Sequence, residues 1–368
     1  MQYKRMPIEI ESPEQTGYDR IACNLAESSV ADLSFSDLSV SLNHIVLGYS
    51  DHLGKKELRQ LIAEPIGMGA DQVLITTGAA AALFMLHTVL LGPSDHLVVL
   101  RPNYASNIEV PRAIGCSITY IDLQFESSWK PDLEKIRAAI RPSTKLISIT
   151  TPHNPTGMVI AEKEIDALVQ LVEERDIFLL VDETYRDTCF PAVYPPVAGK
   201  SMQVISVASL SKAFGLPGVR TGWLLSRHPS LFEKLLAAKE MIYITNAVLE
   251  EEISYQFLLQ KQSWSDKINK KAMQNYDVLR AWLEREKRLE CVLPRGGVVC
   301  FPRFKKEIPA DTSVFYRALM DKYQTMVGPG HWFEVPDSYM RIGFGWVKTE
   351  LLQKGLQNIS LAIDDCLR

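Results

Sequence analysis

Residues 209–222 read Ser-Leu-Ser-Lys-Ala-Phe-Gly-Leu-Pro-Gly-Val-Arg-Thr-Gly, which places Lys212 among small residues and glycines. The hydroxyls of Ser209 and Ser211 come just before the lysine, and Arg220 follows it by eight positions. A lysine amine can condense with an aldehyde as a Schiff base, while hydroxyls and a guanidinium can hold a phosphate. The run therefore suits a phosphorylated aldehyde cofactor, although a lysine in such a run taken alone is more often a solvated surface residue.

The composition is that of an ordinary globular protein, with 368 residues, 46% hydrophobic and 23% charged, and a formal net charge of -4. A chain of this length can bury a large core, and we expect one large domain and a smaller one. The charge balance gives no electrostatic reason to expect nucleic acid or an acidic membrane as a partner. Six scattered cysteines, with no CxxC pair and no metal-ligand spacing, predict reduced thiols and no metal site. The N-terminus carries no secretory h-region, and no apolar run is long enough to span a bilayer, so we expect a cytoplasmic protein.

Short apolar runs alternate with amphipathic stretches through the middle of the chain. The runs mostly lack polar alternation and predict buried strands at residues 73–77, 96–101, 117–123, 145–151, 177–182, 204–209 and 222–226. Helices are predicted between them at residues 79–91, 132–140, 162–175 and 229–242. This alternation predicts an α/β fold with a mainly parallel, seven-stranded sheet flanked by helices.

The pattern changes after about residue 248, where a long charged helical stretch covers residues 249–287. The remainder predicts a small α+β unit with strands at 290–293, 298–304 and 340–344 and helices at 312–323 and 349–366. The polar, irregular N-terminus is expected to pack with it. The predicted large, cofactor-binding domain is therefore residues 46–285, and the small domain is built from residues 1–45 and 286–368.

The candidate site residues fall just after predicted strands, which is where ligands bind in open α/β sheets. The turn Gly78-Ala79-Ala80 opens a helix, so its backbone amides and the helix dipole can form an anion site, with a plain strand-to-helix turn as the alternative. Tyr104 follows the next strand and can stack on a flat heteroaromatic ring or pack in the core.

Two further strand ends carry polar side chains suited to such a ring. Asn154 lies between prolines in Thr-Pro-His-Asn-Pro-Thr-Gly, residues 151–157, so its amide donor has a defined direction toward a ring hydroxyl or phenolate oxygen. Asp182 ends a strongly apolar strand, and a buried carboxylate there needs a cation such as a protonated pyridine nitrogen, unless it caps the following helix. Tyr185 follows closely and can donate to the ring oxygen.

Taken in this order, the motifs resemble the pyridoxal-phosphate enzymes of fold type I, and among them the class I/II aminotransferases of the aspartate aminotransferase-like superfamily. The resemblance runs from about Asn24 to Arg341 and implies pyridoxal 5'-phosphate as the cofactor. It implies that Lys212 forms the internal aldimine and that Asp182 pairs with the pyridine nitrogen. The other implied cofactor contacts are Asn154 and Tyr185 at the phenolic oxygen, Tyr104 over the ring, and Gly78, Ala79, Ala80, Ser209, Ser211 and Arg220 around the phosphate.

The resemblance also reaches the subunit partner and the substrate. The segment at residues 48–54, Gly-Tyr-Ser-Asp-His-Leu-Gly, resembles one that delivers a tyrosine to the neighbouring subunit's phosphate, which implies a homodimer with Tyr49 acting across its interface. Arg341, in Met-Arg-Ile-Gly, resembles the arginine that grips the substrate α-carboxylate as a bidentate pair. Asn24 stands where the family's N-terminal segment approaches the substrate.

The sequence departs from the family pattern at three places near the expected cofactor and substrate sites. Ala81 stands where the family often has glutamate or glutamine, and residues 24–28 lack the usual proline and glycine signature. The pair His331-Trp332 falls where members vary their substrate pocket, and a packed loop aromatic is its alternative interpretation.

The resemblance implies an aminotransferase that moves an amino group between an α-amino acid and a 2-oxo acid, with the freed amine of Lys212 as general base. A lyase or cyclase of specialised amino-acid metabolism remains the alternative, because the same cofactor cradle supports elimination and cyclisation. A non-catalytic sensor domain would follow a DNA-binding module, which residues 1–45 do not resemble. The sequence assigns no second arginine to a substrate side chain, so the amino donor stays open.

Overall fold

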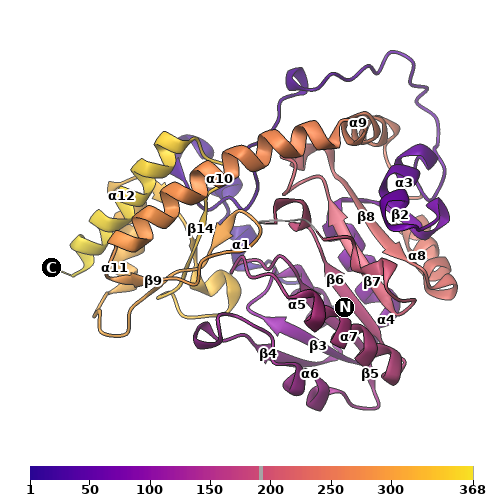
Figure 1. The fold of residues 1–368 in the computed structure, drawn as a ribbon, viewed down its shortest axis with the longest axis horizontal. Coiled ribbons are helices and arrows are strands. Elements are labelled where there is room, and N and C mark those ends of the chain that lie inside the picture. The colour runs from indigo at the N-terminus through magenta and orange to yellow at the C-terminus, as the bar shows by residue number, and fades with distance from the viewer. Residues whose placement is uncertain (190–193, 368) are drawn as a thin grey trace.

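The computed structural model describes residues 1–189 and 194–367, and a seven-stranded sheet lies at its centre (Figure 1). The strands follow the order β2-β8-β7-β6-β5-β3-β4 across the sheet. Their bounds are β2 (Val73–Thr77), β3 (His96–Arg101), β4 (Ser117–Asp122), β5 (Thr144–Thr150), β6 (Phe178–Asp182), β7 (Val204–Ser209) and β8 (Thr221–Ser226). Strand β8 runs antiparallel to β2 and β7, whereas the other pairs are parallel. The predicted mainly parallel sheet is confirmed.

Successive residues of the strands point to opposite faces of the sheet and pack into two separate cores. In β3, Val98 and Leu100 belong to one buried cluster, while Leu97 and Val99 belong to another. This follows from the two-residue period of a strand, and both faces are apolar because helices cover both. Each of these side chains is at most 1% exposed, which corresponds to about 1.5–3 kcal/mol of hydrophobic stabilisation per side chain.

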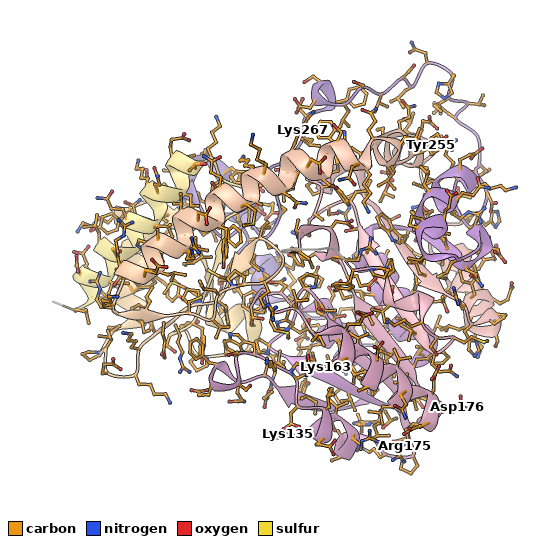
Figure 2. The ribbon with its side chains drawn as sticks, in the orientation of Figure 1. Lys135, Lys163, Arg175, Asp176, Tyr255 and Lys267 are labelled. Carbon is orange, nitrogen blue, oxygen red and sulfur yellow. The ribbon has the colours of Figure 1, made fainter. Side chains whose placement is uncertain are left out.

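The helices that cover the sheet are α3 (Lys56–Ala63), α4 (Gly78–Leu90), α5 (Ser106–Ile114), α6 (Leu133–Ala139), α7 (Glu162–Arg175) and α8 (Pro229–Ile242). Helices α6 and α7 pack on one face, and α4 and α8 on the other. All four helices predicted for this region are present. Helix α5 was not predicted, because Pro111 lies inside it and interrupts the helical pattern. Figure 2 shows charged side chains such as Lys135 and Arg175 on the outer surface of these helices.

The chain after residue 248 builds a further core beside the sheet. Its helices are α9 (Val248–Leu259), α10 (Lys261–Arg285), α11 (Thr312–Arg317) and α12 (Thr349–Cys366), and its short strands are β9 (Leu289–Glu290), β10 (Val299–Cys300), β11 (Arg303–Phe304), β12 (Thr325–Met326), β13 (Gly328–Pro329) and β14 (Met340–Gly343). The predicted helical stretch at 249–287 is two helices, separated at Gln260. Helix α10 lies along α12 (Figure 1), and its residues Ala272 and Leu279 enter the same core as Leu352.

The N-terminal segment contributes α1 (Pro7–Ile10), α2 (Pro13–Thr16) and β1 (Cys23–Asn24). Strand β1 pairs in parallel with β12, and Leu25 joins the C-terminal core, whereas Ile8 joins a core of the sheet. The N-terminal segment therefore contacts both parts of the molecule. These contacts agree with a small domain assembled from both ends of the chain, and its boundaries stay a prediction. Within the described ranges, no helix combines the length and apolar character needed to cross a membrane.

Candidate active site

Thr150, Asp182 and Ser209 line a cavity of about 270 Å³. The first two are the last residues of β5 and β6, and Ser209 ends β7, so the cavity lies at the carboxyl ends of these strands. The start of α4, strand β14 and the helices α1 and α2 complete its wall. The predicted site residues on this wall are Ala79, Ala80, Tyr104, Asn154, Asp182, Tyr185, Ser209, Ser211, Lys212, Arg220 and Arg341.

At one end of the cavity, the backbone turn at Gly78 and Ala79 packs closely against Gly222. The first amides of α4, which begins at Gly78, have no acceptor within the helix. A Cβ added at Gly222 would lie 2.4 Å from the main-chain carbon of Gly78 and 2.5 Å from the nitrogen of Ala79. A Cβ added at Gly78, whose φ is +73°, would lie 2.5 Å from Nη2 of Arg220. Amides, helix N-terminus and guanidinium thus gather where a phosphate dianion would be stabilised.

The Arg220 and Ser209 side chains are positioned by the loop that carries Lys212. The Nη1 atom of Arg220 donates to the carbonyl of Pro217 over 2.9 Å, and Ser209 Oγ accepts from the Ser211 amide over 3.4 Å. The backbone carbonyl of Lys212 accepts from the Val30 amide over 3.0 Å. The N-terminal segment therefore helps to fix the loop at the base of the cavity.

Asp182 presents a buried negative charge with no cationic partner among the described residues. Its side chain accepts from Thr184 Oγ1 over 2.6 Å, from the Thr184 amide over 3.1 Å and from Asn107 Nδ2 over 3.3 Å. Burial raises the pKa of Asp182, and these hydrogen bonds oppose that rise. A protonated ring nitrogen would supply the missing cation. Sequence reasoning missed Thr184 and Asn107; the latter lies on the unpredicted helix α5.

Lys212 faces the same cavity with its amine free. Across the described chain no hydrogen bond or ion pair reaches its Nζ. Burial lowers the pKa of Lys212, while the nearby carboxylate of Glu27 acts in the opposite direction and the guanidinium of Arg341 adds to the decrease. A lysine whose charged form is disfavoured in this way is suited to attack an aldehyde.

Arg341 is only 3% exposed and points into the cavity from β14. It donates through Nη1 to Asn154 Oδ1 over 3.1 Å and through Nη2 to the carbonyl of Ala26 over 2.7 Å. Its Nε is buried without a partner in the described structure. A buried guanidinium with a donor to spare fits a carboxylate ligand. Beside it, burial raises the pKa of Tyr185 to about 12, so this phenol remains protonated and can donate a hydrogen bond.

Three of the predicted site residues are not on the cavity wall of this chain. Gly78 lies behind it, against Arg220. Asn24 accepts through Oδ1 from the Ala26 amide over 3.0 Å, so it shapes the loop that carries Ala26 and Glu27, and a direct contact with substrate is not part of this arrangement. Tyr49 is 86% exposed, as it must be if it serves a neighbouring subunit.

The N-terminal segment closes one side of the cavity, as the family resemblance implied, but its acidic side chains were not predicted to line it. Glu9, Glu14 and Glu27 line it, and Trp332 faces them from the C-terminal part. Glu11 anchors the segment: its Oε2 accepts from Trp332 Nε1 over 2.7 Å and contacts His331 Nε2 over 2.8 Å. Because these contacts join residues more than 300 positions apart, no local sequence signal could have revealed them.

Comparisons with known proteins place the whole chain among related enzymes. The sequence profile of the family described as Aminotransferase class I and II matches residues 29–359. A capreomycidine synthase from Streptomyces vinaceus is 29% identical over 93% of this chain and 90% of its own length. An aspartate aminotransferase from Sulfurisphaera tokodaii is 26% identical over 88% of this chain and 84% of its own. The solved structure of a PLP-dependent aminotransferase from Streptococcus suis matches with a TM-score of 0.92 at 26% identity, covering 100% of both chains.

The profile spans most of the chain, and the solved structure matches along its whole length. The charged and polar groups on the cavity wall fit the parts of a phosphorylated pyridine aldehyde. The chain therefore belongs to the class I and II aminotransferase family, and its cofactor is pyridoxal 5'-phosphate.

Proposed function

We propose that the chain is an aminotransferase that moves an amino group from an α-amino acid to a 2-oxo acid, with Lys212, Asp182 and Arg341 as its principal residues. The observation that carries this proposal is that all three line one cavity, where among the described residues Asp182 lacks a cationic partner, the Lys212 amine lacks a hydrogen bond, and Arg341 Nε lacks a partner. Each suits a different group: Lys212 the cofactor aldehyde, Asp182 the ring nitrogen, and Arg341 the substrate α-carboxylate.

When bound, the cofactor supplies an electron sink that stabilises negative charge on the substrate Cα. Asp182, fixed by Thr184 and Asn107, would keep the ring nitrogen protonated. Arg341 holds the α-carboxylate and so orients the Cα–H bond. The Lys212 amine would take the proton from the substrate Cα and deliver it on the cofactor side of the substrate nitrogen, and its lowered pKa favours this use as a base.

A lyase or cyclase is the second candidate function. It is favoured by the relative named capreomycidine synthase, which is 29% identical over most of this chain. The residues that hold the cofactor do not fix which bond at Cα breaks. An amino acid that yields product without any added 2-oxo acid would support the second candidate, whereas strict dependence on a 2-oxo acid acceptor would support the aminotransferase.

A homodimer is part of the proposal, with Tyr49 reaching the partner's phosphate site. Val46, Leu47 and Tyr49 are 84%, 76% and 86% exposed, and a run of exposed apolar side chains is typical of a subunit interface. Arg220 is also exposed at its own phosphate site, where a second chain could reach it. Sizing of the purified protein tests the dimer, and weaker cofactor binding in Tyr49→Phe would support the contact.

The cytoplasm is the proposed compartment. All six cysteines are free thiols, as expected in a reducing environment.

The direct test of the function is purification with excess pyridoxal 5'-phosphate, followed by an assay for 2-oxo acid formation from a panel of amino acids. We expect a coloured protein with acceptor-dependent turnover. Lys212→Ala should lose both the absorbance band of the lysine Schiff base and turnover. A wild-type protein that stays colourless would contradict the proposal.

A further inference from the structure

We propose that the amino acid taken by this site carries a cationic side chain, which the carboxylates of Glu9, Glu14 and Glu27 recognise. This inference rests on the proposed function, and it names the substrate class of the same cavity. All three carboxylates belong to the N-terminal segment and line the cavity that holds Lys212 and Arg341.

The cations of the cavity already have roles. Arg220 lies at the phosphate turn, Lys212 serves the aldehyde, and Arg341 fits the α-carboxylate. Of the acids, Asp182 fits the ring nitrogen, and among the described residues the three glutamates form no ion pair, although Lys212 and Arg341 act electrostatically on Glu27. The cofactor and the substrate α-carboxylate therefore do not neutralise the N-terminal wall, by which we mean the carboxylates of Glu9, Glu14 and Glu27. A positive side chain on the substrate would neutralise it.

The three glutamates are not used by the fold in the way that their neighbour Glu11 is. Glu11 binds both His331 and Trp332 and so anchors the segment. Among the described residues, the Glu9 and Glu14 carboxylates have no ion pair or hydrogen bond, and Glu27 has only the hydroxyl of Tyr18 at 3.0 Å. Carboxylates with no partner, or with a single hydroxyl partner, are available to a ligand.

A second observation points to a ligand in the same space. Arg341 is 3% exposed, yet its Nε has no partner among residues 1–189 and 194–367, and its guanidinium interacts electrostatically with Glu27. Glu27 also interacts with Lys212, and burial raises the pKa of Glu27 while Lys212 opposes the rise. A substrate held between Arg341 and Lys212 thus has Glu27 beside it, with Glu9 and Glu14 close enough to act on Lys212 as well.

Charge also decides against other substrates. An acidic side chain would meet three carboxylates of like charge, and a neutral one would leave the half-buried carboxylate of Glu27 without a cationic ligand, while Glu9 and Glu14 stay exposed. A guanidinium or ammonium group would pair with them through charge-assisted hydrogen bonds, which are the stronger kind. Specificity would then come from both attraction and repulsion at the N-terminal wall.

L-Arginine and L-citrulline provide the test, because they have nearly the same shape and differ in side-chain charge. Their dissociation constants are measured by calorimetry on the cofactor-loaded Lys212→Ala variant, and their kcat/KM values on the wild-type holoenzyme. We expect arginine to bind on the order of 10- to 100-fold more tightly than citrulline, the range expected for hydrogen bonds between charged groups. L-Lysine against L-norleucine repeats the comparison with an ammonium group.

Glu27→Gln should reduce the preference for arginine, and the triple variant with Glu9→Gln and Glu14→Gln should abolish it. Glu64→Gln, on an exposed turn away from the cavity, is the matched control and should keep it. Equal binding of arginine and citrulline, or a preference that survives in the triple variant, would overturn the inference. Binding is measured without turnover, so a protein that prefers arginine but makes no 2-oxo acid would retain this inference and lose the proposed aminotransferase activity.

Discussion

Gly222→Ala tests whether the turn at the start of α4 holds the cofactor phosphate. The added methyl group would lie 2.4 Å from the main-chain carbon of Gly78 and 2.5 Å from the nitrogen of Ala79. Since carbon atoms in contact need about 3.5 Å, the turn must retreat by about 1 Å. Amide hydrogen bonds of about 2.9 Å would then exceed the length at which they count as bonds.

The loss of affinity follows from these distances. A hydrogen bond to a charged group contributes about 1.5–3 kcal/mol, so losing two of them costs about 3–6 kcal/mol. The dissociation constant for pyridoxal 5'-phosphate should therefore rise roughly 10²- to 10⁴-fold. The overpacked turn should also lower the free energy of unfolding by about 1–3 kcal/mol.

The assay is a titration of the apo-protein with pyridoxal 5'-phosphate, followed by the absorbance of the bound aldehyde. Circular dichroism confirms first that the variant is folded. Gly218→Ala is the matched control, because a Cβ at Gly218 meets nothing within 4 Å. A folded Gly222→Ala protein with wild-type affinity would show that the turn does not contact the phosphate, and the reasoning would fail.

Asp182→Asn should lower kcat/KM by about 10²–10³-fold while the protein still folds, because preorganised charge at a reacting centre has about that value; steady-state kinetics and thermal unfolding check this, and near-normal turnover would contradict it. Arg341→Ala should raise KM for the amino acid with cofactor content unchanged, as measured by kinetics and absorbance, and a loss of cofactor would point to a role in folding instead. Burial opposes the charged form of His331, but hydrogen bonds to Glu11 and Asp337 outweigh it and raise the pKa. The ion pair between charged His331 and Glu11 is therefore fully formed below the ordinary histidine pKa of about 6.5, where it holds the N-terminal segment in place. It is lost as the pH rises through the raised pKa of His331. Hydrogen exchange of residues 7–16 should accelerate over that rise, and His331→Gln should remove the pH dependence; a pH-independent wild type would refute it.

The sheet and its site residues could be predicted because their signals are local. Buried strands such as β6 and β7 are continuous apolar runs, and Asp182 and Ser209 stand at their ends. Arg341 was predicted from the motif around it, although nothing local shows that it reaches Asn154 across 187 positions.

The parts that were missed depend on contacts between distant segments. Helix α5 contains Pro111, and its sequence shows no clear helical periodicity of apolar residues. Its Asn107 donates a hydrogen bond to Asp182. The N-terminal segment is polar and irregular, and its position over the cavity is set by the bonds of Glu11 to His331 and Trp332. Its acidic wall was therefore visible only in the folded chain.

The central claim is that Lys212 carries the cofactor covalently. Holoenzyme reduced with borohydride fixes any Schiff base as a stable amine, and mass spectrometry of the digested protein locates it. The account predicts a pyridoxyl phosphate label on Lys212. A label on another lysine, or no label on protein purified with excess pyridoxal 5'-phosphate, would contradict it.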